Sequence, residues 1–166
     1  LADKNLARVL KIDVQNKSAQ RLQSHLAERK GFIEAAIKSW QGFLFINGLS
    51  LEEYIEGLMN KGRLLEQLAK IENADKHYLR VIEVQSDFAP AHVRHIRLLV
   101  KVGHGEKAKQ AIDEALSLIS TEEQAKFHMD RLLNAVNILN NEESTNDVSI
   151  DALIEDAMSV VVSEGY

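Results

Sequence analysis

The side chains best suited to chemistry in this sequence are three histidines in its second half. His92 and His95 lie three residues apart, and His104 follows nine residues later. Side chains at i and i+3 share one face of a helix, so two imidazoles could reach the same metal ion. No carboxylate lies one turn further on, and no second ligand pair is evident. We therefore predict no metal site, and expect partly buried histidines with local hydrogen-bond partners.

A group of carboxylates offers no catalytic pair either. Glu52, Glu53 and Glu56 follow Ser50, which places them in the first turns of a helix, where the helix dipole favours acidic groups. The chain has no cysteine, so it has no thiol nucleophile, disulfide or thiolate metal ligand. It also lacks a phosphate-binding glycine loop and a nucleophile elbow. We predict a protein that is not an enzyme and needs no cofactor.

The composition is that of a globular helical chain. The 166 residues are 45% hydrophobic and 27% charged, which is close to the globular average and suits one domain. One proline (Pro90) and eight glycines are too few for an all-β chain with many turns. No apolar run approaches 18 residues, so we predict no membrane span. The chain starts without methionine or a signal peptide, and we expect a processed or excised fragment.

Charge is unevenly distributed along the chain. Residues 140–166 carry seven acidic side chains and no basic one, whereas residues 1–139 carry 18 acidic and 20 basic side chains. A nearly neutral body with an acidic tail would not attract phosphates, so we predict no nucleic-acid partner. The sequence assigns no compartment; the cytoplasm is favoured, with the periplasm as the alternative for a processed fragment.

The strongest signal is an internal repeat. Small residues recur at intervals of 34, 38 and 34, at Ala2, Ala36, Ala74 and Ala108. Large apolar residues follow four positions later, at Leu6, Trp40, Tyr78 and Ile112, and a further set follows at Val9, Phe43, Val81 and Ala115. Tight glycine turns precede two of the copies, at Gly31 and Gly103. The period predicts stacked pairs of helices.

This pattern resembles the tetratricopeptide repeat (TPR) family. The family has a small residue at position 8, Gly near 15, Ala at 20, an aromatic residue at 24 and Pro at 32. Lys17–Ser50 has Ser24, Gly31, Ala36 and Trp40 at positions 8, 15, 20 and 24, and Ile55–Phe88 has Leu58, Gly62, Leu65, Ala74 and Tyr78 at positions 4, 8, 11, 20 and 24. Ala89–Glu122 has Gly103 and Ala108 but places His92, His95 and Ile96 at positions 4, 7 and 8. Val14 and Ser86 stand where the proline is expected.

The resemblance implies an all-α fold, a right-handed α-α superhelix of about 3.5 helical hairpins plus a C-terminal capping helix. We expect a TPR-like domain over 1–139, made of a partial repeat 1–16, repeats 17–50, 51–88 and 89–122, and a further helix 121–139. The helices expected before residue 121 span 2–12, 17–29, 32–45, 51–68, 71–84, 89–101 and 105–119. A capping box at Ser50–Glu53 starts one helix a turn early and explains the 38-residue interval.

The last part of the chain is expected to hold a linker and one more helix. Residues 140–149 are polar or acidic and indicate an acidic linker. Residues 150–166 contain an amphipathic acidic helix. The favoured interpretation is a cap on the open end of the repeats. The alternative is a segment that mimics a ligand or partner.

The resemblance also implies a peptide-binding groove on the first helix of each repeat. Its positions 5, 9 and 13 correspond to Arg21, His25, Arg29, Met59, Arg63, Val93, Arg97, Lys101, Phe127 and Arg131. One cationic or potentially cationic residue recurs at position 9 in every repeat, and guanidinium groups bind carboxylates through two parallel hydrogen bonds. Glu66 follows Arg63 by three residues, and Glu28 precedes Arg29. The alternative is therefore that these cations are solvated or paired internally.

We therefore expect a non-catalytic scaffold for protein–protein interaction, with a concave basic groove that binds an acidic or amphipathic peptide. One alternative is a TPR region that positions substrate or partner for a larger enzyme. Another is self-association into a homo-oligomer, through the Leu6/Val9 face or the C-terminal helix.

Overall fold

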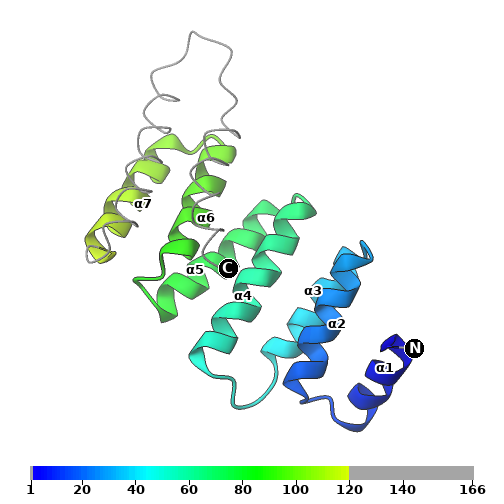
Figure 1. The fold of residues 1–166 in the computed structure, drawn as a ribbon. Coiled ribbons are helices and arrows are strands. Elements are labelled where there is room, and N and C mark those ends of the chain that lie inside the picture. Colours follow the sequence, from blue (N-terminus) through cyan, green and yellow to red (C-terminus); the bar gives the residue numbers. More distant parts are fainter. Residues whose placement is uncertain (1, 120–166) are drawn as a thin grey trace. The chain divides into compact units, whose positions relative to one another are not determined.

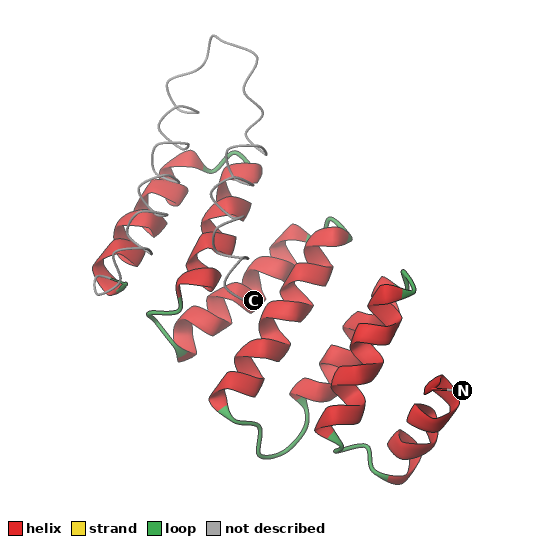
Figure 2. Cartoon of the chain, in the orientation of Figure 1, coloured by secondary structure: helices red, strands yellow, loops and turns green. Residues whose placement is uncertain are grey.

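The computed structural model describes residues 2–119, and the regular secondary structure in this part of the chain is helical (Figures 1 and 2). Its helices are α1 (Ala2–Ile12), α2 (Lys17–Arg29), α3 (Ile33–Leu44), α4 (Leu51–Gln67), α5 (Ile71–Val84), α6 (Ala89–Lys101) and α7 (Gly105–Leu118). Each begins and ends within one residue of its predicted bounds. The segments predicted at 121–139, 140–149 and 150–166 lie outside the described residues.

Within each part of the chain, neighbouring helices pack as in stacked helical hairpins. α2 lies against α3, α3 against α4 and α6 against α7, while α1 packs on α2 less extensively (Figure 1). By its packing the chain divides into two compact units, Leu1–Val81 and Ile82–Tyr166, and the division falls inside α5. Each unit is therefore described by itself below.

The turn inside each helical pair repeats the same backbone motif three times. Gly31, Ala69 and Gly103, all at position 15, have φ angles of 77°, 55° and 78°. The amide after each of them donates to the carbonyl five residues before it, at distances of 2.8–2.9 Å. This 6→1 bond satisfies a carbonyl that the helix end leaves open. A non-glycine residue is destabilised by roughly 1–2 kcal/mol in this left-handed region. At Ala69, where glycine is missing, packing therefore imposes the turn.

The residues that mark the repeat form the buried core. Nine of them are 0% exposed: Ala36, Trp40, Phe43, Ala74, Tyr78, Val81, Ala108, Ile112 and Ala115. In the first copy Leu6 is 9% exposed and Val9 is 40% exposed. The sequence periodicity therefore identified the core correctly from the second copy onward.

Side-chain size at position 8 is matched to size at position 24. A Cβ placed on Gly62 would lie 2.6 Å from Cε1 of Tyr78, so this pair requires glycine. In the second unit Ile96 stands at position 8, and it shares a buried cluster with Ile112, which is smaller than an aromatic residue. A bulkier residue in the first helix is thus compensated by a smaller one in the second.

Two of the turns that lack the expected proline are each held by a side-chain hydrogen bond. Nε2 of Gln20 donates to the carbonyl of Val14 at 3.3 Å, and Nε2 of His92 lies 2.8 Å from the carbonyl of Ser86. Both bonds join position 4 of a repeat to position 32 of the preceding one. A carbonyl only accepts, so His92 carries its proton on Nε2. This confirms the prediction of a buried histidine with a local partner.

The predicted capping box at the start of α4 is present. The Ser50 hydroxyl accepts from the amide of Glu53 at 3.1 Å, and the Glu53 carboxylate accepts from the amide of Ser50 at 2.8 Å. Lys17 donates to the same carboxylate at 2.6 Å and to the carbonyl of Gly48 at 2.9 Å. The added turn of α4 is therefore anchored to α2.

We predict that Gly62→Ala destabilises the protein by about 1–3 kcal/mol, because the new methyl group overlaps the Tyr78 ring. The cost should be smaller in a Tyr78→Ile background, which copies the Ile96/Ile112 arrangement. Urea unfolding of the two single variants and the double variant measures this coupling. Equal costs in both backgrounds would contradict the size-matching argument.

We predict that stability falls as the pH drops below 6.5. Burial lowers the pKa of His92 from 6.5, so the folded chain binds this proton less readily than the unfolded chain. The contribution is complete above pH 6.5 and is lost as the pH falls toward the folded pKa. His92→Gln, which uses the residue of the equivalent Gln20, should keep the fold and flatten the dependence. His77, whose pKa burial also lowers, should retain a part of it. Thermal melts across this range would show whether the variant is flatter than wild type.

Candidate peptide-binding face

Two of the cations predicted to face a ligand are bound to carboxylates of the neighbouring first helix. Arg21 of α2 donates to both oxygens of Glu56 of α4, at 2.8 Å from Nε and 2.6 Å from Nη2. Its guanidinium also lies 5.2 Å from the centre of the Phe43 ring. Arg63 of α4 donates through both terminal nitrogens to Glu28 of α2, at 2.8 Å from Nη2. Each pair has the parallel geometry that favours guanidinium–carboxylate bonds.

A third pair extends these two into a row. Lys17 of α2 contacts Glu53 of α4 at 2.6 Å. We call the three pairs, Lys17–Glu53, Arg21–Glu56 and Arg63–Glu28, the α2–α4 ion-pair row. Each pair joins residues 35 or 36 positions apart, so a constant offset brings one face of α2 against one face of α4. In the first two pairs the cation belongs to α2, and in the third it belongs to α4.

Hydrogen bonding within the row shifts the pKa of Glu28 and that of Arg21. The hydrogen bond from Arg63 lowers the pKa of Glu28, and its Coulombic attraction acts in the same direction. The hydrogen bond to Glu56 raises the pKa of Arg21 above its already high value. The side chains of these two pairs are between a quarter and a third exposed. Water therefore screens them, and each contributes modestly to stability.

The other predicted residues of the first unit lie on an open surface. His25 is exposed and places its ring edge-on to Trp40, with centroids 5.5 Å apart. Arg29 is exposed, and within residues 2–119 it forms no hydrogen bond or ion pair. Met59 is half-buried. Among the predicted groove residues of this unit, Arg29 is therefore a cation available to an anionic ligand.

The second unit carries two more available cations on α6. Arg97 is half-buried and Lys101 is exposed, and neither has an ion-pair or hydrogen-bond partner within the described part of the chain. Their i, i+4 spacing puts them on one helix face. Val93, which was also predicted to line the groove, packs into the core of the second unit. It is 3% exposed and belongs to the buried cluster with Ile96 and Ile112. Phe127 and Arg131 lie outside the described residues.

No family model and no curated protein matches the sequence. Solved structures match the fold. The structure titled "TPR2B-domain:pHsp70-complex of yeast Sti1" has a TM-score of 0.59 at 18% identity, over 74% of this chain and 97% of that one. MamA has a TM-score of 0.62 at 18% identity, over 96% and 86%. The first TPR of Spaghetti (RPAP3), bound to the HSP90 peptide SRMEEVD, has a TM-score of 0.54 at 14% identity, over 75% and 96%.

This chain has the TPR fold. The described helices α2–α3, α4–α5 and α6–α7 are its pairs, and α1 occupies the place of a second helix in a preceding pair. In TPR terms, the ion-pair row joins the first helices of two consecutive pairs. Modules of this fold generally serve protein–protein interaction.

The described residues also bear on two other features considered from the sequence, a metal site and a membrane span. Among residues 2–119, no three histidine or acidic side chains are grouped so that they could hold a metal ion. His92 instead holds its turn through Ser86. No helix in this range is both long enough and apolar enough to cross a bilayer.

The TPR positions alone did not reveal the acidic half of the row. Glu53 and Glu56 were interpreted as a helix start, which they are, but they also bind Lys17 and Arg21. The available signal was the spacing of opposite charges by 35 or 36 residues, close to one repeat. That spacing places acid and base at nearly equivalent positions of neighbouring first helices.

We predict that Arg63→Glu destabilises the first unit by about 1 kcal/mol, because it sets two carboxylates against each other. The charge swap Glu28→Arg with Arg63→Glu should restore most of the loss. Arg29→Glu is the matched control, since Arg29 is exposed and unpaired among the described residues. Urea unfolding at low salt measures all three. If the control costs as much as Arg63→Glu, or the swap restores nothing, the pairing does not stabilise the unit.

Proposed function

We propose that this chain is a non-catalytic protein-binding module whose TPR first helices take an acidic or amphipathic segment of a partner. Arg97, half-buried on α6 and without an anionic partner in the range 2–119, carries the proposal. A guanidinium removed from water gains most from a carboxylate that accepts two hydrogen bonds. Lys101, one turn along, would extend the same contact.

The two units contribute differently to this proposal. In the first unit a ligand carboxylate would have to displace Glu56 or Glu28 to reach Arg21 or Arg63. Arg29 is open without such competition. We therefore assign ligand binding to Arg29, Arg97 and Lys101, and structural pairing to Arg21 and Arg63.

Structures of the same fold support an acidic ligand. The RPAP3 domain is bound to the HSP90 peptide SRMEEVD, which is rich in acidic residues. At 14% identity this shows that the fold can carry such a site, and the choice of partner depends on the side chains of each chain.

Self-association through the Leu6/Val9 face receives less support. Leu6 is 9% exposed on its own chain, so Val9, 40% exposed, remains the accessible member of the pair. A single half-exposed valine is ordinary on a protein surface.

We predict that Arg97→Glu combined with Lys101→Glu reduces the capture of acidic peptides at least tenfold, because carboxylates lose both donors and meet repulsion. The probe is a phage-displayed library of random dodecapeptides, from which wild type should select Asp and Glu beside apolar residues. The matched control is Lys38→Glu with Lys107→Glu, two exposed lysines whose reversal gives the same net charge.

The control should capture the selected peptides as wild type does, and circular dichroism should show equal helicity for both variants. Selection of neutral or basic peptides by wild type would overturn the proposal. Equal loss in the two variants would reduce the effect to net charge and also overturn it.

A further inference from the structure

α1 carries a row of cations on its exposed side. Lys4, Arg8 and Lys11 are spaced i, i+4 and i+7, so they share one face of the helix. All three are exposed, and none forms an ion pair or side-chain hydrogen bond within the described part of the chain. Asp13, the acidic residue that follows the helix, accepts instead from the amide of Gln15 at 3.0 Å. The row is therefore open to an anionic partner.

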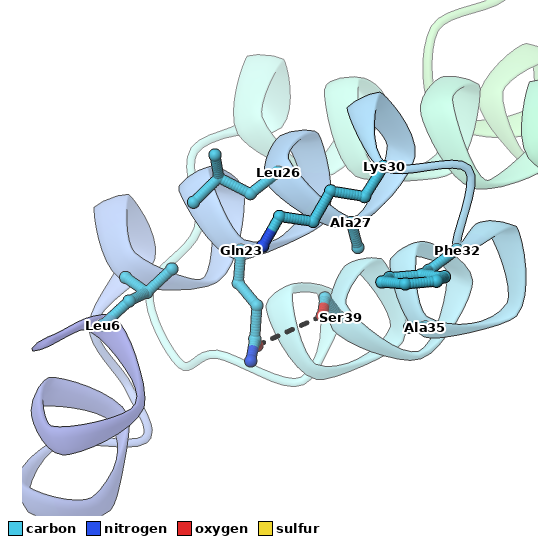
Figure 3. Close-up of a pocket in the computed structure, with 8 residues that line it drawn as sticks. All are labelled: Leu6, Gln23, Leu26, Ala27, Lys30, Phe32, Ala35 and Ser39. Carbon is cyan, nitrogen blue, oxygen red and sulfur yellow. Dashed lines mark hydrogen bonds between the residues drawn. The ribbon is translucent and has the colours of Figure 1, made fainter. Parts of the chain in front are cut away.

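The other side of α1 is turned toward its own unit. Leu6 is 9% exposed and lines a pocket of about 230 Å³ together with residues of α2 and α3. Figure 3 shows Leu6 on the side of α1 that points toward Leu26 of α2. By the 3.6-residue period, Lys4, Arg8 and Lys11 lie on the far side of the helix axis from Leu6. The cations therefore form a surface that is separate from this pocket.

An exposed isoleucine lies beside the cations. Ile12 is the last residue of α1, follows Arg8 by four positions and is 87% exposed. Val14, two residues further on, is 61% exposed. A partner that brings apolar as well as acidic side chains would gain most here, because it also removes this apolar surface from water. We call Lys4, Arg8, Lys11 and Ile12 the α1 cationic face.

The chain itself contains a segment of matching chemistry. Residues 140–166 hold seven acidic side chains and no basic one. Their last part, residues 150–166, has four of the acids, at Asp151, Glu155, Asp156 and Glu164. Its apolar residues recur at helical spacing, at Ile150, Leu153, Ile154, Ala157, Met158 and Val161. Acids on this segment would meet the cations of α1 while its apolar residues meet Ile12. Charge complementarity of this kind steers association and fixes its register.

We propose that the α1 cationic face binds residues 150–166 of a second copy of this chain. α1 and this segment belong to different packing units of one chain, and the exposure of Ile12 leaves the face open in a single copy. The contact joins two different surfaces, so every copy that binds keeps one free face or one free segment. Such heterologous contacts extend into open chains or close into rings.

Self-association should therefore depend on concentration and on salt. In sedimentation velocity of the 166-residue chain at low salt, the weight-average mass should rise with concentration and pass that of a dimer. Exposed charges are screened beyond about 3 Å at about 1 M salt, so the mass should fall toward that of the monomer there.

Charge reversals on the two surfaces give the decisive variants. Arg8→Glu with Lys11→Glu reverses the α1 cationic face, and Glu155→Lys with Asp156→Lys reverses the acidic segment. Each pair of substitutions should weaken self-association at least tenfold, because like charges then meet across the contact. Circular dichroism should show the helicity and melting temperature of wild type for both, since the residues changed on α1 are exposed.

Each variant has a control with the same change in net charge. Lys38→Glu with Lys107→Glu reverses two exposed lysines away from α1. Glu142→Lys with Glu143→Lys reverses two acids that precede the proposed segment. Both controls should associate as wild type does.

Mixing the two decisive variants tests the head-to-tail arrangement itself. The segment variant keeps an intact α1 face, and the α1 variant keeps an intact segment. The mixture should therefore form a 1:1 heterodimer that grows no further. A chain that carries all four reversals should regain self-association, because its charges are exchanged between the two surfaces.

A wild type that stays monomeric at every concentration would overturn the proposal, and this includes a segment that binds α1 of its own chain. Equal losses in the controls, or a mixture without heterodimer, would overturn it as well. The Arg97→Glu/Lys101→Glu variant should associate as wild type does, so this contact and the proposed acidic-peptide face fail separately. Loss of association in that variant would place the segment on α6 and contradict the proposal. Binding to phosphatidylglycerol vesicles without self-association would assign the α1 cationic face to a membrane surface and also contradict it.

Discussion

Close approach of neighbouring helices is the constraint on which the rest of this structure depends. It requires alanine at the start of each second helix, and Ala36, Ala74 and Ala108 are completely buried there. It also fixes the sum of two side-chain sizes, as Gly62 against Tyr78 shows. Once the pairs are stacked this tightly, equivalent positions of successive first helices face each other. The ion-pair row results from that alignment.

The helices and the core could be predicted from the sequence because their signals are local or periodic. A capping box such as Ser50–Glu53 starts a helix within a few residues, and a buried residue such as Tyr78 recurs at a fixed interval. The site was less predictable, because it depends on which side chains of two different helices meet. The ion pair between Arg63 and Glu28 follows from the offset between α2 and α4, which no single helix encodes.

Val93 shows the limit of transferring a position from one repeat to another. Position 5 holds the ion-paired Arg21 in the first unit and a half-buried methionine in the next repeat. In α6 the same position belongs to the core with Ile96. A β-branched apolar residue gains more by turning toward a neighbouring helix than by facing water. Lys101, the last residue of α6, gains by the reverse arrangement and remains exposed.

The additional turn at the start of α4 has a consequence for how such a chain can change in length. It adds residues only at the tip of a helix, where growth runs along the axis and leaves every later residue in phase. An insertion of one residue inside α4 would instead rotate the following side chains by about 100° and break the contacts on both sides. Helix tips of this kind are therefore the places where stacked repeats can absorb insertions, and the bond from Lys17 to Glu53 shows that new length can acquire its own anchor.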